Sequence, residues 1–411
     1  MEYKQIKLRK GKEESLKRFH PWVFSGAILT IDEGIQEGDI VRVITFYGDF
    51  IAVGHYQEGS IAVRVLSFDD ILIDDDFWAH RLSAAFNMRL TIGIAPSDEA
   101  LEGGTAHNNT YRLIHGEGDN LPGLIVDVYG QTAVMQAHSI GMHLSRRQIA
   151  KQLKAVMQGR IQHIYYKSET TLPFMTVDDM SGFLVGGSDE NIAIENGLHF
   201  YVDWLKGQKT GFFVDQRENR SLLERYAFGK RVLNMFCYTG GFSVYAMRGG
   251  AQLVHSVDSS AKAVELTRRN IALNFPDDAR HDAFCEDAFK FLDTSHPSSL
   301  LSLQSSSAYD LIILDPPAFA KHRGALHNAL KGYTRLNQKA FETIAPGGIL
   351  FTFSCSQVVT KDHFRNAVFT AAALARRRVR ILHQLHQPAD HPVNIYHPEG
   401  EYLKGLVLYV E

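Results

Sequence analysis

The chain has 411 residues, of which 45% are hydrophobic and 22% charged, and this composition excludes a disordered or fibrous protein. Lys and Arg (43) nearly balance Asp and Glu (46), which gives a net charge of −3. This excludes a protein that coats nucleic acid with a uniformly basic surface, but it does not exclude local basic patches. Three cysteines are too few and too scattered for a disulfide framework or a cysteine-rich zinc site.

No segment has the pattern of a membrane span or a secretory signal. Residues 1–14 are charged throughout and contain no apolar core. The longest uncharged run, residues 343–360, is interrupted by Pro346, Gly347 and Gly348. We therefore expect a cytoplasmic protein with no membrane partner. At roughly 150 residues per domain, the length predicts two or three domains.

The first region, residues 1–71, predicts a small and mainly β domain. Residues 39–44, 50–54 and 60–66 form short strands of alternating apolar and polar residues, and glycine-containing turns separate them.

The middle region, residues 72–190, mixes helices and strands and predicts an α+β domain. A helix with apolar positions at Phe77, Leu82, Phe86 and Leu90 begins it. The later elements are a strand-turn-strand around 116–123, a strand over 124–128, a helix over 145–157 and a strand over 161–167.

In the third region, residues 191–411, strands and helices alternate. The expected strands are 232–236, 253–257, 309–314, 348–353, 378–382 and 406–410, and helices are expected over 243–248 and 261–274. Strands separated by helices of this length predict a largely parallel sheet that is covered on both faces.

Three features predict a nucleoside-binding site at the carboxyl edge of this sheet, where such folds bind ligands. The turn over 234–243 contains paired glycines, which let a ligand approach the backbone. Asp258 ends the second strand and can accept hydrogen bonds from both ribose hydroxyls, while Asp287 can accept from an adenine amino group. Each feature alone could be an ordinary turn or a helix cap, but their combination favours adenosine.

The kind of cofactor follows from what this turn lacks. There is no G-x-G-x-x-G fingerprint in the turn, so the tight cradle for a pyrophosphate is missing. This disfavours NAD or FAD and favours an adenosine cofactor without phosphates. S-adenosylmethionine is such a cofactor. Among the histidines near the C-terminus the spacing is irregular, and we expect no metal.

Two reactive side chains are expected at the same edge. Asp315 follows an apolar strand, and the two prolines after it hold it on a rigid stem. Cys355 follows the next strand, where its thiolate could attack an electrophilic ring carbon, although a lone cysteine is usually a small buried hydrophobe. We interpret Cys237 and Cys285 as packing residues.

These motifs resemble a known family, the S-adenosylmethionine-dependent RNA methyltransferases with an N-terminal PUA domain. Within it, the chain is similar to 23S ribosomal RNA cytosine-5 methyltransferases of the large-subunit methyltransferase I type, over essentially its whole length. The matching segments are His20–Phe24, Asp119–Asp127, Gly207–Arg217, Asp315-Pro-Pro, Ser354-Cys-Ser, Asp390-His-Pro392 and Pro398–Gly405.

The resemblance implies a multidomain α/β protein. Its parts would be a PUA-like β-barrel, an α+β middle domain and a Rossmann-like class I methyltransferase domain with a mainly parallel sheet. Cys355 takes the role of the nucleophile. The implied cofactor contacts are Lys209, Thr210, Phe212, Gln216, Phe236, Tyr238, Gly240, Asp258, Ser259, Asp287 and Asp315. Many RNA enzymes of this chemistry have a second cysteine directly after the two prolines, whereas this chain has Ala318.

The expected reaction is addition of the Cys355 thiolate at C6 of cytosine, with Asp315 holding the Watson–Crick edge of the base. The base must leave its stack, so single-stranded or loop ribosomal RNA is the expected partner. Lys321 and Arg323 are placed where a neighbouring phosphate would lie.

Three other functions remain open at this point. A guanine N-methyltransferase would need the same Asp-Pro-Pro but no cysteine nucleophile. A ribosome-assembly factor could keep the fold without catalysis, and a nicotinamide oxidoreductase is disfavoured by the missing glycines. The oligomeric state is also open, with a homodimer as one candidate.

Overall fold

The computed structural model describes residues 3–104, 107–172, 180–188, 190–293, 309–320 and 322–411. The chain forms two compact units, each assembled from three segments. The first unit comprises Met1–Gly197, Val202–Asp215 and Ala389–Gly400, and the second comprises Leu198–Tyr201, Gln216–Pro388 and Glu401–Glu411. In the part of the chain that the structure describes, no helix is long and apolar enough to cross a membrane.

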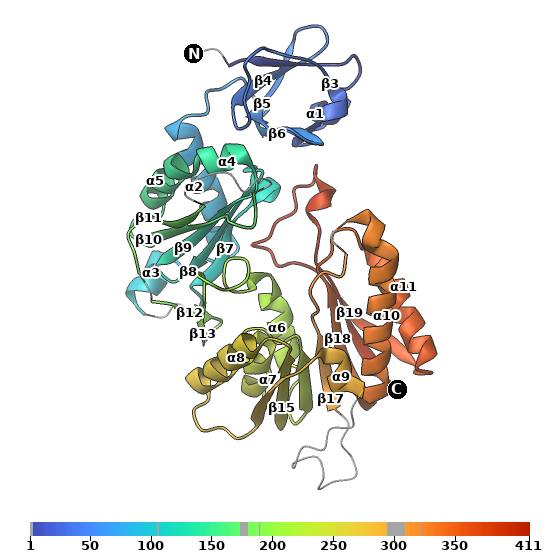
Figure 1. The fold of residues 1–411 in the computed structure, drawn as a ribbon. Helices are drawn as coiled ribbons and strands as arrows, with labels where there is room; N and C mark the ends of the chain where they lie inside the picture. Colours follow the sequence, from blue (N-terminus) through green and yellow to red (C-terminus); the bar gives the residue numbers. More distant parts are fainter. Residues whose placement is uncertain (1–2, 105–106, 173–179, 189, 294–308, 321) are drawn as a thin grey trace. The chain divides into compact units, whose positions relative to one another are not determined.

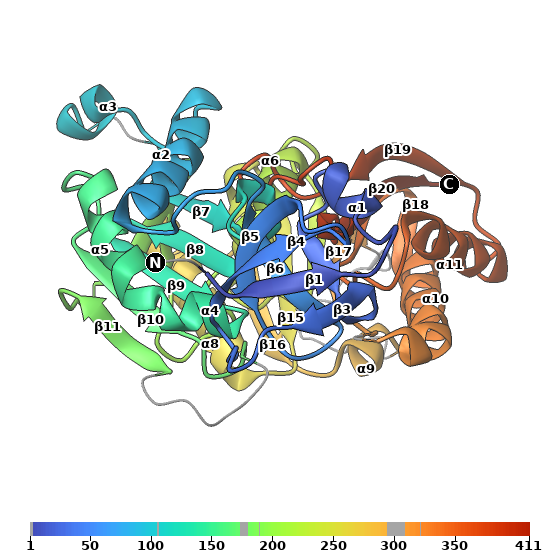
Figure 2. The same cartoon turned by 90° about the horizontal axis from the view of Figure 1, so that it is seen from above.

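The first unit begins with a six-stranded sheet in the order β2-β6-β5-β4-β1-β3, several strands of which are seen side by side in Figure 2. Its strands are β1 (Gln5–Leu8), β2 (Trp22–Phe24), β3 (Ile28–Ile31), β4 (Ile40–Ile44), β5 (Phe50–Tyr56) and β6 (Ile61–Ser67), with the short helix α1 (Glu14–Lys17). The three strands predicted from alternation are β4, β5 and β6. In β4, Val41 and Val43 are fully buried while Ile40, Arg42 and Ile44 are partly exposed, as the alternation predicts.

A second sheet of the first unit has the strand order β11-β10-β9-β8-β7. Its strands are β7 (Thr110–His115), β8 (Leu124–Tyr129), β9 (Thr132–Ala137), β10 (His163–Lys167) and β11 (Ser181–Val185). The helices of this part are α2 (Asp75–Thr91), α3 (Asp98–Glu102), α4 (Ile140–Leu144) and α5 (Arg146–Val156). Helix α2 begins where the Asp74 side chain accepts a hydrogen bond from the Phe77 backbone N–H at 3.0 Å. It buries Phe77, Trp78, Leu82 and Phe86 in the core.

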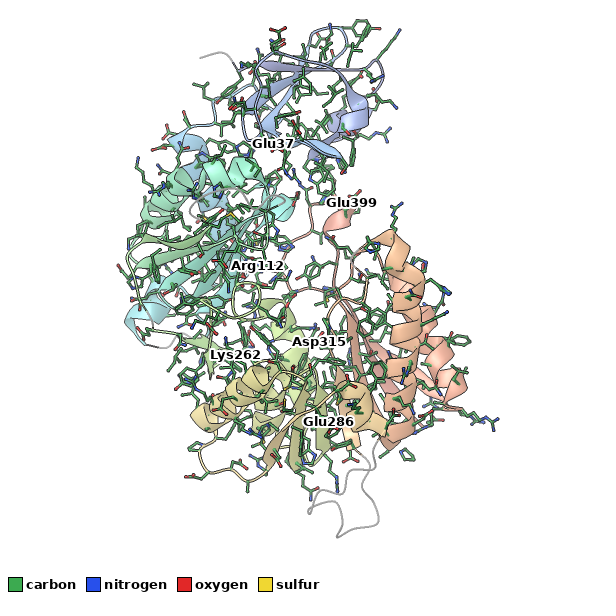
Figure 3. All side chains as sticks on the ribbon, in the orientation of Figure 1. Glu37, Arg112, Lys262, Glu286, Asp315 and Glu399 are labelled. Carbon is green, nitrogen blue, oxygen red and sulfur yellow. The ribbon has the colours of Figure 1, made fainter. Side chains whose placement is uncertain are left out.

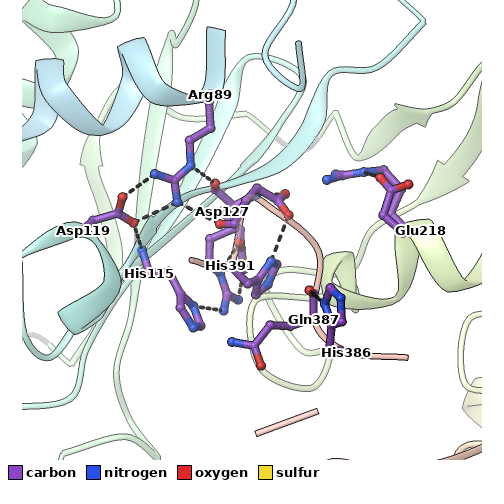
Figure 4. Close-up of polar contacts among 11 residues, drawn as sticks. Arg89, His115, Asp119, Asp127, Glu218, His386, Gln387 and His391 are labelled. Atoms are coloured by element: carbon purple, nitrogen blue, oxygen red, sulfur yellow. Dashed lines mark hydrogen bonds and ion pairs between the residues drawn. The ribbon is translucent and has the colours of Figure 1, made fainter. Parts of the chain in front are cut away.

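Two buried ion pairs lie at the second sheet of the first unit (Figure 4). Arg112, labelled in Figure 3, makes two hydrogen bonds to the fully buried Asp127, at 2.7 and 2.8 Å. Arg89, also fully buried, binds both oxygens of Asp119. Bidentate pairs between an arginine and a carboxylate fix both the distance between the two side chains and their relative orientation.

The segment Ala389–Gly400 completes this network. Asp390 is fully buried, and its carboxylate accepts a hydrogen bond from the Arg112 backbone N–H at 3.0 Å. The Asp390 carbonyl oxygen accepts a second one from Arg89 at 2.8 Å. The Asp119–Asp127 and Asp390-His-Pro392 motifs therefore hold the first unit together from distant parts of the sequence.

The second unit is built on a seven-stranded sheet in the order β16-β15-β14-β17-β18-β20-β19. Its strands are β14 (Arg231–Met235), β15 (Leu253–Asp258), β16 (His281–Cys285), β17 (Tyr309–Leu314), β18 (Ile344–Ser354), β19 (Val379–Leu385) and β20 (Lys404–Val410). The first five strands in spatial order are parallel, whereas β20 runs antiparallel to both β18 and β19. The prediction of a largely parallel sheet is confirmed, with β20 as the reversed strand.

Helices cover both faces of this sheet (Figure 1). On one face lie α7 (Gly241–Arg248) and α8 (Ala261–Asn274), with α6 (Arg217–Glu224) packed on α7. On the other face lie α9 (Ala288–Asp293) and α10 (Leu326–Thr343), with α11 (Lys361–Leu374) packed on α10. Strands β12 (Ile192–Glu195) and β13 (Leu198–Tyr201) belong to the first and second units, respectively.

Candidate active site

The candidate site lies at the carboxyl edge of the seven-stranded sheet. Because β14, β15, β16, β17 and β18 are parallel, the residues that follow them share this edge. Phe236 follows β14, Asp258 ends β15, Asp315 follows β17 and Cys355 follows β18. Asp315 is labelled in Figure 3. The sequence prediction that these side chains meet at one edge therefore agrees with the topology.

The turn after β14 has an unusual backbone. Phe236 and Tyr238 have φ angles of 59° and 48°, in the left-handed region that bulky residues rarely adopt. The Asp258 carboxylate stabilises this conformation, because it accepts a hydrogen bond from the Tyr238 backbone N–H at 3.0 Å. Strain of this kind occurs preferentially at functional sites. It was not predictable from the sequence, which has no glycine at either position.

Gly240 is needed for close packing. Its φ is 76°, and a Cβ there would lie 2.7 Å from the Thr267 methyl carbon. The glycine lets α7 begin directly against α8.

The three other predicted nucleoside contacts differ in their environment. Asp258 uses its second oxygen to accept from the Ser260 backbone N–H at 2.9 Å. Asp287 directly precedes α9, and one of its oxygens accepts from the backbone N–H groups of Phe289 and Lys290 at 3.0 and 3.1 Å. The helix-cap interpretation of Asp287 is thus realised by one oxygen, and its other oxygen has no partner among the described residues. Ser259 is exposed.

Asp315 is held by a residue at the start of α6. The Gln216 amide donates a hydrogen bond to the Asp315 carboxylate at 3.0 Å, and the Gln216 oxygen accepts from Asn219 at 2.6 Å. Gln216 is only 3% exposed. The predicted site residue Gln216 therefore lies against the acid that was predicted to bind the base.

Cys355 is half-buried, and its sulfur lies 3.9 Å from the carbonyl oxygen of Pro316, the residue after Asp315. The serines on either side of it are fixed by buried hydrogen bonds. Ser354 donates to the Tyr333 hydroxyl at 2.9 Å, and Ser356 donates to the Ala320 carbonyl oxygen at 2.6 Å. This bracing keeps the thiol at the edge of the sheet next to Asp315.

Lys404 belongs to the matching segment Pro398–Gly405, but no role was predicted for it from the sequence, and the structure places it near Cys355. Strand β20 runs opposite to β18 and pairs Lys404 with Ser354, so the first residue of β20 lies at the carboxyl edge. The Lys404 ammonium donates to the Ser356 carbonyl oxygen at 2.6 Å. Burial lowers the pKa of Lys404 to about 8, against the opposing effects of Cys355 and Glu401. Only the antiparallel pairing of β20, which the sequence does not reveal, brings this lysine to the site.

Three of the predicted cofactor contacts belong to the first unit. Lys209 is exposed and has a positive φ of 52°. The buried Thr210 hydroxyl donates to Asp127 at 2.6 Å, and Phe212 is 3% exposed. Thr210 thus takes part in the ion-pair network described above.

The remaining predictions have mixed outcomes. Arg323 is exposed in a short 3-10 turn (Arg323–Ala325) just before α10, and Lys321 lies outside the described residues. Cys237 is buried, as expected of a packing residue, and burial raises the pKa of its thiol to about 12. The interpretation of Cys285 as a packing residue is wrong, because Cys285 is exposed at the end of the edge strand β16.

Comparisons with known proteins agree with this architecture. A model of the S-adenosylmethionine-dependent methyltransferase family matches residues 140–396, and a model of a PUA-like domain matches residues 6–68. A protein from Streptococcus mutans described as a SAM-dependent methyltransferase has a TM-score of 0.81 at 22% identity, covering 98% of this chain and 99% of that chain. This likeness concerns the fold alone.

Closer relatives are found among curated sequences. The chain is 38% identical to ribosomal RNA large subunit methyltransferase I of Shewanella denitrificans, over 99% of each protein. It is 36% identical to the protein of the same name from Escherichia coli O139:H28, again over 99% of each. The chain therefore has an N-terminal PUA-like domain and a C-terminal methyltransferase fold with a mixed sheet. It belongs to the S-adenosylmethionine-dependent methyltransferase family that includes the ribosomal RNA large subunit methyltransferase I proteins.

Proposed function

We propose that this protein methylates C5 of a cytosine in 23S ribosomal RNA, in the cytoplasm, through a covalent bond between Cys355 and C6 of the base. The observation that carries the proposal is the position of Cys355, half-buried at the carboxyl edge beside the Asp315-Pro316 segment. We also propose that the chain divides into a PUA-like RNA-binding domain (1–71), an α+β domain (72–190) and the methyltransferase domain (191–411).

The second unit offers residues that suit S-adenosylmethionine. The Asp258 carboxylate accepts one backbone hydrogen bond on each oxygen and so keeps lone pairs for the ribose hydroxyls. The free oxygen of Asp287 suits the adenine amino group, and Phe236, Tyr238, Gly240, Ser259 and Asp315 complete the proposed contacts. When bound, this cofactor supplies a methyl group on a positively charged sulfur. Lys209, Thr210 and Phe212 stay predictions of the family resemblance.

The chemistry of the base is assigned to the chain's own side chains. The Cys355 thiolate forms the bond to C6, and the C5–C6 π electrons move toward C4 and N3 of the ring. Asp315 binds the Watson–Crick edge and favours a proton at N3, so that no unstabilised anion builds up. C5 then carries the electron density that accepts a methyl group. When the C5 proton leaves, the electron pair of the carbon–sulfur bond returns to Cys355.

Basic residues beside this edge suit an RNA backbone. Arg323 is exposed and has no partner among the described residues. It precedes α10, where His327, Lys331 and Arg335 follow one another at intervals of four residues and line a groove between α10 and α11. This groove has no acidic residue in its lining. A row of basic residues that begins at the catalytic edge suits the phosphates flanking a target nucleotide.

The product of the reaction tests the proposal directly. We expect the purified protein with S-adenosylmethionine to convert cytidine in 23S ribosomal RNA to 5-methylcytidine, detected by mass spectrometry of the digested nucleosides. A strain that lacks the protein should lose the same modification. Methylated guanosine as the product would replace this function with guanine N-methylation.

Asp258→Ala is expected to weaken S-adenosylmethionine binding by about 1–3 kcal/mol, because it removes charge-assisted hydrogen bonds to the ribose. Isothermal titration calorimetry measures the change, and the thermal midpoint shows that the domain remains folded. Glu265→Ala removes an equal charge from an exposed position on α8 and serves as the control. Parental affinity in Asp258→Ala would remove Asp258 from the site.

A further inference from the structure

Lys404 contacts the residues on both sides of Cys355, the proposed nucleophile. It faces Ser354 across the β18–β20 ladder, and its ammonium donates to the carbonyl oxygen of Ser356 at 2.6 Å. Cys355 is the residue between these two contacts. The ammonium is therefore anchored on the residue that follows Cys355, within range for the charges of Lys404 and Cys355 to act on each other.

The burial of Lys404 favours an anionic neighbour. The residue is 5% exposed, and a buried ammonium is costly unless it is paired. The Ser356 carbonyl oxygen is its hydrogen-bond partner, and in the described part of the chain Lys404 forms no ion pair with a carboxylate. The nearest acid on its own segment, Glu401, binds Lys361 at the start of α11 at 2.5 Å.

Several other charged or titratable groups among the described residues lie near Lys404 and the thiol. Lys361 and Glu401 act on Lys404 with opposite signs and bind each other. Tyr333 on α10 faces both Cys355 and Asp315, and burial together with these two groups raises its pKa to about 12, so it stays neutral. Asp315 already accepts from Gln216. Asp362, Arg365 and His386 line the same pocket as Lys404, but among the described residues none of them pairs with it. Cys355 is next in sequence to the Ser356 carbonyl that holds the ammonium and is therefore the group placed to act as its counter-charge.

We propose that Lys404 is a positioning residue that holds Cys355 as a thiolate. The S–H bond of Cys355 gives its proton to the Lys404 amine, the electron pair stays on sulfur, and the amine becomes an ammonium beside it. The same ammonium stabilises sulfur when it leaves C6 at the end of the reaction, because a thiol of lower pKa is a better leaving group. The role in methyl transfer rests on the function proposed above, whereas the thiolate pair does not.

If Lys404 and Cys355 form an ammonium–thiolate pair, the rate at which Cys355 reacts with iodoacetamide should depend on pH in a specific way. The intact protein is alkylated across pH 5 to 10, and mass spectrometry of its peptides follows Cys355 and Cys285 separately. In the parent, the midpoint of Cys355 alkylation should lie about one pH unit or more below that of the exposed Cys285. Lys404→Met should raise the Cys355 midpoint by about one unit or more and leave the Cys285 midpoint unchanged. Lys404→Arg, which keeps the charge, should restore most of the shift.

Two outcomes overturn the proposal, and neither depends on activity. One is a Cys355 midpoint in the parent equal to that of Cys285, which needs no variant and so survives a failure of Lys404→Met to fold. The other is an unchanged midpoint in a Lys404→Met protein whose S-adenosylmethionine affinity and thermal midpoint are parental. If the midpoints behave as expected but Cys355→Ala still methylates RNA, the thiolate pair stands and the covalent mechanism falls.

Discussion

Cys355→Ala is expected to abolish methyl transfer, with a fall in rate on the order of 10⁴-fold or more, because it removes the thiol to which the bond to C6 is assigned. Binding of S-adenosylmethionine should stay nearly parental, since the thiol is assigned no contact with the cofactor. Single-turnover transfer of a radiolabelled methyl group to 23S ribosomal RNA measures the first effect. Calorimetric titration measures the second.

Cys285→Ala is the matched control, because Cys285 is a free thiol of the same unit that lies at the exposed end of an edge strand. It should methylate at the parental rate. RNA carrying 5-fluorocytosine should form a gel-stable adduct with the parent and with Cys285→Ala but not with Cys355→Ala, because fluorine at C5 cannot leave as a proton does. Methylation by Cys355→Ala at near the parental rate would make Cys355 a packing residue and favour guanine N-methylation.

Asp127→Ala is expected to destabilise the first unit by about 3–5 kcal/mol, the cost of leaving one partner of a buried ion pair uncompensated. Asp127 is fully buried and accepts two hydrogen bonds from Arg112 and one from Thr210. Chemical denaturation followed by intrinsic fluorescence measures the loss. The transition of the first unit should move to lower denaturant concentration.

Two variants separate the effect of the ion pair from a general effect of charge. Asp75→Ala removes an aspartate that pairs with Lys151 on the surface of the same unit, and it should cost less than about 1 kcal/mol. Arg112→Met combined with Asp127→Leu removes both buried charges and should recover part of the stability. Equal destabilisation by Asp75→Ala and Asp127→Ala would show that burial of the pair does not matter.

Much of the second unit could be predicted because its strands and helices are marked locally. The apolar run 309–314 is β17, and the helix expected over 261–274 is α8, which begins after the capping side chain of Ser260. Buried parallel strands are continuous apolar runs, and helix caps are set by one side chain. The acids at the strand ends, Asp258 and Asp315, follow from the same runs.

The features that could not be predicted depend on pairing between distant segments. Strands β1, β2 and β3 have only three or four residues each, too few for a clear alternation. Lys404 lies in a segment that matches the family, but its place near Cys355 follows only from the antiparallel register of β20. Cys285 was misinterpreted because the sequence does not say which strand forms the edge of a sheet.

The late closure of the first unit has a consequence for synthesis of the protein. Asp390 is separated in sequence by 278 residues from Arg112 and by 301 residues from Arg89. At about 5–20 residues per second, a ribosome needs about 15–60 s to add that length of chain. During this interval the N-terminal unit lacks the segment Ala389–Gly400. A nascent chain that is cut or stalled before residue 389 never acquires this segment. We therefore expect that chains truncated near the C-terminus have a less stable N-terminal unit. Cellular proteases should degrade this unit faster than in the full-length protein.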